Sequence, residues 1–379
     1  MYNGIKIIDA HTHNAQQFDP EYFAAFLART GTDAACVNTV AHSRCISLTP
    51  QALALKELFP GRFYVFGGLD MSEYYLHPET LGEHMAAYGR RLLEMGCDGI
   101  KMLEGKPQMR KMYPIPDFDA PCWEPFWAWA EEAGIPFMWH VNDPENFWDR
   151  EHAPAFAVAQ GWLYDGSYVN NEAQYAQVLS VLARHPRLKL IFAHFFFMSA
   201  QLDRLAGILE RFSGVCVDLT PGIEMYENFS AAPDASRAFF DRFHDRILYG
   251  TDIGGRCILM GEHKEFDEAE NLRRPEIVRE FLTLDGETEI ASDGHFLIGR
   301  PAFTMRGLGL RGDRLAEILG TNFTRAAGTT PRPVCGGAVL AECARLRRLM
   351  PVLGAKLPGF VPEFSVIEYA EKTFAKKMR

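Results

Sequence analysis

Short apolar segments alternate with longer amphipathic segments along most of the chain. Eight runs rich in Val, Ile, Leu and Phe predict β-strands at residues 5–10, 33–40, 62–69, 98–103, 135–140, 188–194, 214–220 and 246–252. Apolar positions at helical spacing predict helices at residues 20–30, 50–59, 79–96, 122–134, 171–186, 199–214 and 234–245. Because apolar strands of this kind are typical of buried parallel sheets, the repeated β/α units predict a (β/α)8 TIM barrel, with a doubly wound open sheet as the alternative.

The pattern changes after Gly328. Residues 331–337 (PRPVCGG) are typical of a linker, and residues 338–354 and 362–379 predict two further helices. We therefore expect a catalytic barrel domain at residues 1–328. A C-terminal helical extension at residues 329–379 then packs on the barrel or on the partner subunit of a homo-oligomer.

Composition narrows the range of partners. The 379 residues carry a formal charge of -10 without a basic cluster, which argues against binding to nucleic acid or an anionic membrane and favours a small-molecule substrate. The eight cysteines form no CxxC pair, no apolar run approaches the ~20 residues of a membrane span, and the N-terminus enters a predicted strand at once. We expect reduced thiols and a cytoplasmic enzyme.

Metal-binding side chains stand at the ends of four predicted strands. His11 and His13 follow the first strand, His140 ends the fifth, His194 ends the sixth and Asp252 ends the eighth. The carboxyl ends of barrel strands meet at one mouth, so these five side chains are expected to converge. Imidazoles with one carboxylate suit a borderline divalent ion such as Zn²⁺ and leave a position open for water.

This arrangement predicts hydrolysis of an amide or lactone by a metal-activated water. Asp252 would accept the proton of that water, and a charged His194 would stabilise the developing oxyanion. The alternative is a decarboxylase, in which Arg44, Arg150 or Arg256 would bind the substrate carboxylate. A binding protein with a structural zinc site is a third possibility, although no cysteine joins the cluster.

The segments DAHTHN, MWHVND, FAHFFF and LYGTD resemble the metal-site motifs of the amidohydrolase superfamily. Over about residues 5–328 the chain resembles the branch that contains aminocarboxymuconate semialdehyde decarboxylase, other non-oxidative decarboxylases and uncharacterised metal-dependent hydrolases. The resemblance implies that His11, His13, His140 and Asp252 hold the ion, expected to be zinc, and that His194 acts as acid/base.

The chain departs from this branch at two places. Phe195, Phe196 and Phe197 follow His194, where the decarboxylases often carry glycines. Residues 253–300 form a long segment where the family is usually shorter. The first departure favours hydrolysis over decarboxylation.

The resemblance also bears on how many metal ions the site holds. Binuclear members of the superfamily carry a carbamylated lysine on strand four, where this chain has Lys101. With His194 as a further ligand, a carbamate on Lys101 would allow two ions. Since the most similar branch is mononuclear, we expect one ion.

The long loop after the fifth strand supplies candidates for contact with substrate. Asn142, Asp143 and Trp148 lie in this loop, and Arg256 follows the eighth strand. No GxGxxG, P-loop or GxSxG motif accompanies a suitable strand and helix, which argues against a nucleotide cofactor and a serine nucleophile.

Overall fold

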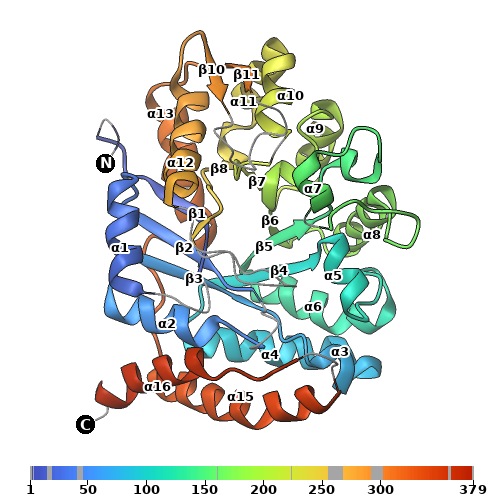
Figure 1. Ribbon diagram of the computed structural model, residues 1–379, viewed down its shortest axis with the longest axis vertical. Helices are drawn as coiled ribbons and strands as arrows, with labels where there is room; N and C mark the ends of the chain where they lie inside the picture. The colour runs from blue at the N-terminus through green and yellow to red at the C-terminus, as the bar shows by residue number, and fades with distance from the viewer. Residues whose placement is uncertain are drawn as a thin grey trace.

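The computed structural model has parallel strands at its centre and helices around them (Figure 1). It describes residues 2, 4–14, 19–40, 46–159, 161–222, 224–254, 268–291, 302–356 and 360–377. The strands of the main sheet are β1 (Ile8–His13), β2 (Ala34–Asn38), β3 (Phe63–Gly68), β4 (Gly99–Gly105), β5 (Pro136–Val141), β6 (Lys189–Phe192), β7 (Val215–Asp218), β8 (Ile247–Leu248) and β9 (Ile253–Gly254). Their order is β8-β7-β6-β5-β4-β3-β2-β1-β9, and all neighbours are parallel.

The two ends of this sheet meet and close the barrel. β8 pairs with β7, and β9, which follows it after residues 249–252, pairs with β1. The residues between them also bond to β1, since the Ala10 amide donates to the Tyr249 carbonyl at 2.9 Å and the Asp252 amide donates to the His11 carbonyl at 2.8 Å. The predicted (β/α)8 barrel is confirmed, with its eighth strand divided into β8 and β9.

The helices begin and end at residues that suit helix boundaries. Asp19 caps the first helix by accepting from the Tyr22 amide, Pro20 occupies its first turn, and Gly96 ends α4 in a left-handed conformation at φ 105°. The helices up to residue 327 are α1 (Pro20–Arg29), α2 (Thr49–Leu58), α3 (Glu73–Leu76), α4 (Leu81–Met95), α5 (Pro107–Met112), α6 (Glu124–Ala133), α7 (Ala155–Ala159), α8 (Asn171–Arg184), α9 (Leu202–Arg211), α10 (Met225–Ala231), α11 (Pro233–Phe243), α12 (Glu268–Thr283), α13 (Gly312–Ala316) and α14 (Asn322–Ala327).

The long segment after Asp252 is partly described. It contains α12 and β10 (Glu287–Ala291), which forms an antiparallel hairpin with β11 (Ala302–Arg306). In Figure 1 this hairpin lies beside α10 at the top of the view, and α10 contacts β11. No helix in the described ranges is long and apolar enough to cross a membrane.

The first strand differs from the prediction in a way that matters for the site. His11 and His13 lie inside β1 rather than after it, because pairing continues from Thr12 to Val37 and Ile253 and from His13 to Gly254. The register of β1 against β2 shifts between Asp9 and Thr12, which is a β-bulge. Ile8 and Ala10 pack in one buried cluster with residues of the other strands, and a bulge beyond them can turn the next side chains to the same interior.

The C-terminal helices lie against the outside of the barrel. α15 (Gly336–Lys356) and α16 (Ser365–Lys377) contact α2 and α4, at the bottom of Figure 1. Arg345 of α15 forms ion pairs with two fully buried carboxylates, Asp70 at 2.6 Å and Glu342 at 2.7 Å. The division of the chain at residue 328 and a contact between subunits stay predictions.

Loss of the Arg345 side chain should destabilise the protein. Arg345→Ala leaves the Asp70 carboxylate buried without its cation and leaves Glu342 with only the more distant Arg91, at 3.5 Å, and we expect a loss of about 3 kcal/mol in the free energy of unfolding, measured by urea denaturation. Arg347→Ala is the matched control on the same helix. Its partner Glu371 is 33% exposed, so the cost should stay below about 1 kcal/mol. Equal losses in the two variants would contradict this account.

Strand β4 contains a buried acidic residue, Glu104. Glu104 is 2% exposed, and burial raises the pKa of its carboxyl from 4.5 to about 7. Glu104 and Lys101 both line a small cavity of about 10 Å³, close to the space that one water molecule occupies. The folded protein therefore holds a proton at Glu104 in a pH range where the unfolded chain has released it.

This proton makes stability depend on pH. Because the folded-state pKa of Glu104 is raised, its contribution is present below about pH 4.5 and is lost as the pH rises to about 7. Glu104→Gln should reduce the fall in unfolding free energy between pH 5 and pH 8 by about 2–3 kcal/mol. Urea denaturation of both proteins with chelator present measures this difference. Identical pH dependence of the two proteins would contradict the buried-acid account.

Candidate metal centre

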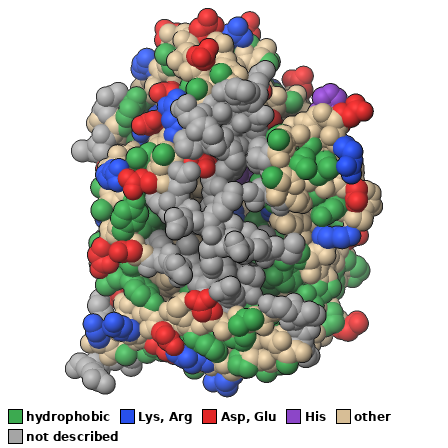
Figure 2. Space-filling view, in the orientation of Figure 1, with side chains coloured by type: hydrophobic (Ala, Val, Ile, Leu, Met, Phe, Trp, Pro, Cys, Tyr) green, Lys and Arg blue, Asp and Glu red, His purple; other side chains and the backbone are tan. Residues whose placement is uncertain are grey.

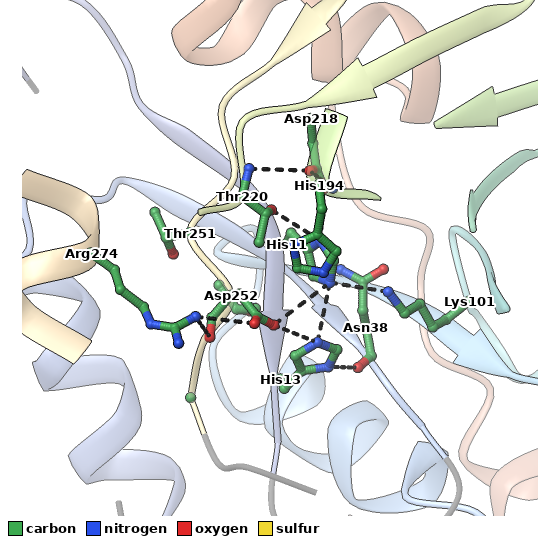
Figure 3. Close-up of polar contacts among 12 residues, drawn as sticks. His11, His13, Asn38, Lys101, His194, Asp218, Thr220, Thr251, Asp252 and Arg274 are labelled. Atoms are coloured by element: carbon green, nitrogen blue, oxygen red, sulfur yellow. Dashed lines mark hydrogen bonds and ion pairs between the residues drawn. The ribbon is translucent and has the colours of Figure 1, made fainter. Parts of the chain in front are cut away.

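Three metal-binding side chains meet at the closure of the barrel. The Nε2 atoms of His11 and His13 lie 3.1 Å apart, and Asp252 Oδ1 lies 3.0 Å from His13 Nε2 and 3.9 Å from His11 Nε2 (Figure 3). These ligand atoms all lie within 4.8 Å of one another. Such a group of two imidazoles and one carboxylate has the right composition for a divalent transition ion.

Hydrogen bonds on the far side of each imidazole determine which nitrogen is protonated. His13 Nδ1 lies 2.6 Å from the Asn38 carbonyl oxygen, which can only accept, so Nδ1 donates. His11 Nδ1 lies 2.7 Å from Asp218 Oδ2, and Thr220 Oγ1 is 3.1 Å away. With both Nδ1 atoms donating, the Nε2 atoms of the two rings are the positions that can bind a cation. They face one another and the Asp252 carboxylate, so the residues fit a metal ion.

Asp252 is held as a carboxylate at this point. Its backbone is left-handed at φ 57°, an uncommon conformation for a residue other than glycine. The other carboxylate oxygen, Oδ2, receives Arg274 Nη1 of α12 at 3.0 Å. Burial alone would raise the pKa of Asp252, but His13, Arg274 and His11 together hold it well below its usual range. Asp252 is therefore negative and available to bind a cation.

Lys101 approaches the same group from β4. Its Nζ lies 3.0 Å from His11 Nε2, and the side chain is 1% exposed (Figure 3). Burial lowers the pKa of Lys101 to about 8, although Asp218 and Asp252 act in the opposite direction. Both the cationic amine and the neutral amine that carbamylation requires are then accessible near neutral pH.

His194 lies beside this group but in an unexpected turn. Its ring centroid is 5.6 Å from that of His11 and 4.9 Å from that of His140. Burial, with a smaller effect of His140, lowers the pKa of His194 well below 6.5, and Nδ1 has no hydrogen-bond partner among the described residues. The charged form of His194 that we expect from the sequence is thus disfavoured, because its positive charge would be buried beside other imidazoles.

Four consecutive residues around His194 adopt a left-handed backbone. The φ angles of His194, Phe195, Phe196 and Phe197 lie between 52° and 59°, which costs roughly 1–2 kcal/mol for each residue. Glycine would adopt this turn without strain. Here packing offsets the cost, since Phe196 stacks on Phe192 at 3.8 Å between ring centroids. Hydrogen bonds also hold the turn: the His194 amide donates to Asp218 Oδ1 at 2.8 Å and the Tyr175 hydroxyl donates to the Phe196 carbonyl at 2.9 Å.

His140 lies close to the cluster but faces another partner. Its Nε2 atom is 3.3 Å from Asp143 Oδ1. Asp143 also accepts two bonds from Lys106, at 2.8 and 2.7 Å, and one from the Tyr164 hydroxyl at 2.5 Å. His140 is therefore outside the three-residue group, and its part in metal binding stays a prediction that requires the ring to turn.

The other candidates from the loop after β5 are held by protein contacts. Asn142 accepts from Gln174 Nε2 at 2.7 Å and donates to the Asn171 carbonyl at 3.2 Å. Trp148 packs on Tyr164 at 4.7 Å between ring centroids, and Arg150 is exposed. Arg44 and Arg256 lie outside the described residues. Contact between any of these side chains and substrate stays a prediction.

Several residues of the site were not identified from the sequence. Asp218 ends β7 but lies two residues inside the seventh predicted strand, residues 214–220, so a search confined to predicted strand ends passed over it. Asn38 acts through its backbone carbonyl and Arg274 reaches the site from α12. Neither has a signal in the local sequence, because only the folded chain brings them to the site.

A second group of metal-binding side chains lies away from the barrel mouth. Glu73, His77 and His84 have ligand atoms within 4.8 Å of one another. The rings of His77 and His84 are stacked, with centroids 3.6 Å apart and planes at 11°. A metal ion lies in the plane of each imidazole that binds it, and one point cannot lie in two parallel planes, so this group is not a metal site as it stands.

Solved structures share this fold at low sequence identity. An uncharacterized TIM-barrel protein from Bordetella bronchiseptica has a TM-score of 0.54 and 13% identity, over 86% of this chain and 99% of that one. 5-Carboxyvanillate decarboxylase from Novosphingobium aromaticivorans, complexed with manganese and 4-hydroxy-3-methoxy-5-nitrobenzoic acid, gives 0.51 and 13% over 86% and 96%. 2,6-Dihydroxybenzoate decarboxylase from Rhizobium gives 0.50 and 13% over 85% and 98%. At this identity the likeness concerns the fold alone.

The family was identified from the sequence itself. No curated protein matches the chain. The family model described as Amidohydrolase matches residues 75–276, more than half of the 379 residues. The matched segment includes Lys101, His140, His194, Asp218 and Asp252. The chain therefore belongs to the amidohydrolase family of metal-dependent enzymes.

Proposed function

We propose that this enzyme hydrolyses an amide or lactone of a small molecule. His11, His13 and Asp252 would hold one divalent ion, with His140 as a fourth ligand after a turn of its ring. The observation that carries the proposal is the convergence of two imidazole Nε2 atoms and the Asp252 carboxylate within 4.8 Å. When bound, a divalent ion supplies a water of lowered pKa and polarises the carbonyl of the substrate.

The residues around the ligands have distinct tasks. Asp252 is a carboxylate at the pH of the cell and can accept the proton of the attacking water. Arg274, 3.0 Å from Asp252 Oδ2, orients the carboxylate so that Oδ1 faces the imidazoles. His194 is neutral and its Nδ1 atom has no protein partner among the described residues, so it can donate or accept a hydrogen bond as the leaving group departs.

The identity and number of ions also belong to this proposal. Two imidazoles and a carboxylate suit Zn²⁺, and the manganese in the Novosphingobium enzyme makes Mn²⁺ the alternative. We propose a single ion, with Lys101 as an amine. Carbamylation of Lys101, with His194 as a ligand, would instead provide for two ions. A homo-oligomer and a cytoplasmic location remain predictions.

Decarboxylation is the second candidate function. It is favoured by the decarboxylases among the structures of the same fold. A carboxylate substrate needs a cationic partner, and the described residues pair Arg274 with Asp252 and Glu270 and Lys106 with Asp143. These pairings support hydrolysis, because neither cation is released without leaving a carboxylate unpaired. Lys101, whose Nζ lies 3.0 Å from His11 Nε2, is the described cation that a carboxylate substrate would use instead.

A substrate panel with and without chelator tests the function. We expect turnover of an amide or lactone that stops on chelation and returns with Zn²⁺ or Mn²⁺. Release of CO₂ from aromatic carboxylic acids, without hydrolysis of any amide or lactone, would establish the second candidate. Hydrolysis that persists in metal-free protein would contradict both.

Replacing His194 should slow the reaction while metal binding persists. His194→Asn removes a group that can transfer a proton, and we expect a fall in kcat on the order of 10²-fold at unchanged metal content. Metal analysis and steady-state kinetics measure the two effects. His152→Asn, at a histidine whose side chain is 73% exposed, is the control and should leave both unchanged. Loss of the metal together with the rate would make His194 a ligand.

Asp218 should control the affinity for the ion. In Asp218→Asn the amide can still accept from the His194 N–H through its oxygen, but its NH₂ group would then face His11 Nδ1 and force the other tautomer. His11 Nε2 would then lose its lone pair. We expect a 10–100-fold fall in metal affinity, measured by competition with a chelator. Asp234→Asn, on the exposed surface of α11, is the control. Unchanged affinity in Asp218→Asn would contradict this role.

A further inference from the structure

A buried carboxyl group without a partner lies in the loop after β7. Glu224 precedes α10, and neither of its buried carboxylate oxygens has a hydrogen-bond partner on any other described residue. Buried polar groups in proteins are almost always hydrogen-bonded, so an unpaired carboxyl requires an explanation. Substitution by an apolar residue would remove the cost of burial, and a group of this kind is typical of functional sites.

The environment of Glu224 is unfavourable to a bare negative charge. Burial raises the pKa of Glu224 to about 7, its own backbone N–H offsets part of that rise, and the charges of Asp143 and Glu227 add to it. No described cation reduces this effect. The side chain is therefore ready to accept a hydrogen bond, and near neutral pH it exists in both protonation states.

The chain around Glu224 places it at the catalytic end of the barrel. The loop begins just after Asp218 and Thr220, which contact His11. The helix that follows, α10, contacts the left-handed turn that carries His194. A carboxyl group in this loop is thus on the same rim as the metal-binding side chains, on the side of β5 to β7.

Gly222 makes room for the carboxyl group. A Cβ atom at residue 222 would lie 3.1 Å from Glu224 Oε2 and 3.3 Å from Oε1, closer than ordinary van der Waals contact. The side chain of Glu224 therefore folds back over its own loop, where a glycine allows it to sit. This close fit fixes the carboxyl position.

We propose that Glu224 is a substrate-binding residue that accepts a hydrogen bond from an N–H or O–H donor of the substrate. The inference rests on the proposed function, since it assumes that the substrate occupies the mouth of the barrel. It deepens that function by defining the substrate class: an amide or lactone that carries an ammonium, amide N–H or hydroxyl group. A substrate carboxylate at this position would instead meet the carboxyl group of Glu224, which Asp143 already disfavours as an anion.

The surface charge of the molecule is also relevant to the charge of the substrate. Figure 2 shows acidic and basic side chains interspersed over the described part of the visible face, without a continuous basic region. The described part of this face thus offers an anionic ligand no general attraction. Recognition would depend on individual groups at the mouth, of which Glu224 is an acceptor.

A matched pair of lactones tests the proposal. Homoserine lactone carries an ammonium group and γ-butyrolactone lacks it. For the metal-loaded enzyme we expect kcat/KM, or the Kd where turnover is too slow to measure, to favour the ammonium-bearing lactone by at least 10-fold. Glu224→Gln should reduce this preference to less than about 3-fold. It should unfold at the same temperature as the wild type or higher, because a buried charge is removed.

Glu227→Gln is the matched control, since it removes a neighbouring acid from α10 and should keep the preference. Absence of preference in the wild type, or a preference that survives in Glu224→Gln, would overturn the proposal. Failure of the proposed hydrolysis has a different signature: neither lactone would show turnover that stops on chelation, whereas the two Kd values would still report whether Glu224 recognises a donor.

Discussion

The hydrogen bond from the Asp252 amide to the His11 carbonyl connects the last strand segment of the barrel to the first. It closes the sheet at 2.8 Å and at the same time brings the Asp252 carboxylate to the imidazoles of β1. The backbone of Asp252 is left-handed there, so the chain turns between β8 and β9 instead of continuing as one strand. Closure of the fold and assembly of the metal-binding group are therefore one event, and a change in register at this point would remove both.

The second constraint is the orientation of the two imidazoles. The Asn38 carbonyl and the Asp218 carboxylate each accept a hydrogen bond from Nδ1 of one ring, which leaves the two Nε2 atoms, 3.1 Å apart, to face a metal ion. These contacts come from β2 and β7, so the barrel itself selects the tautomers. Lys101 and Arg274 then place positive charge on either side of the group, near His11 and Asp252 respectively. A bound metal ion would therefore share the Asp252 carboxylate with Arg274 and would approach the amine of Lys101.

The barrel and the composition of its site could be predicted from sequence, whereas the orientation of its side chains could not. Alternating apolar and amphipathic segments predict the strands, because burial on both faces leaves a local pattern. His11, His13 and Asp252 were found because strand ends in a barrel share one mouth. The bulge in β1, the turn of the His140 ring toward Asp143 and the approach of Arg274 depend on pairings between residues far apart in the chain. The same holds for the left-handed turn at Phe195, where the sequence lacks the glycine that would have signalled it.

The balance of charge at the mouth bears on the reaction. Arg274 neutralises Asp252 and Glu270, and Lys106 neutralises Asp143, so each of these cations is already committed to an acid. Glu224 adds a carboxyl group that no described residue satisfies. A substrate carboxylate that bound Arg274 or Lys106 would have to break one of these pairs, which carries the desolvation cost of an unpaired charge. Lys101, whose Nζ lies 3.0 Å from His11 Nε2, is outside these pairs, so the protonation state of that amine, together with Glu224, bears on the charge of the substrate that the mouth accepts.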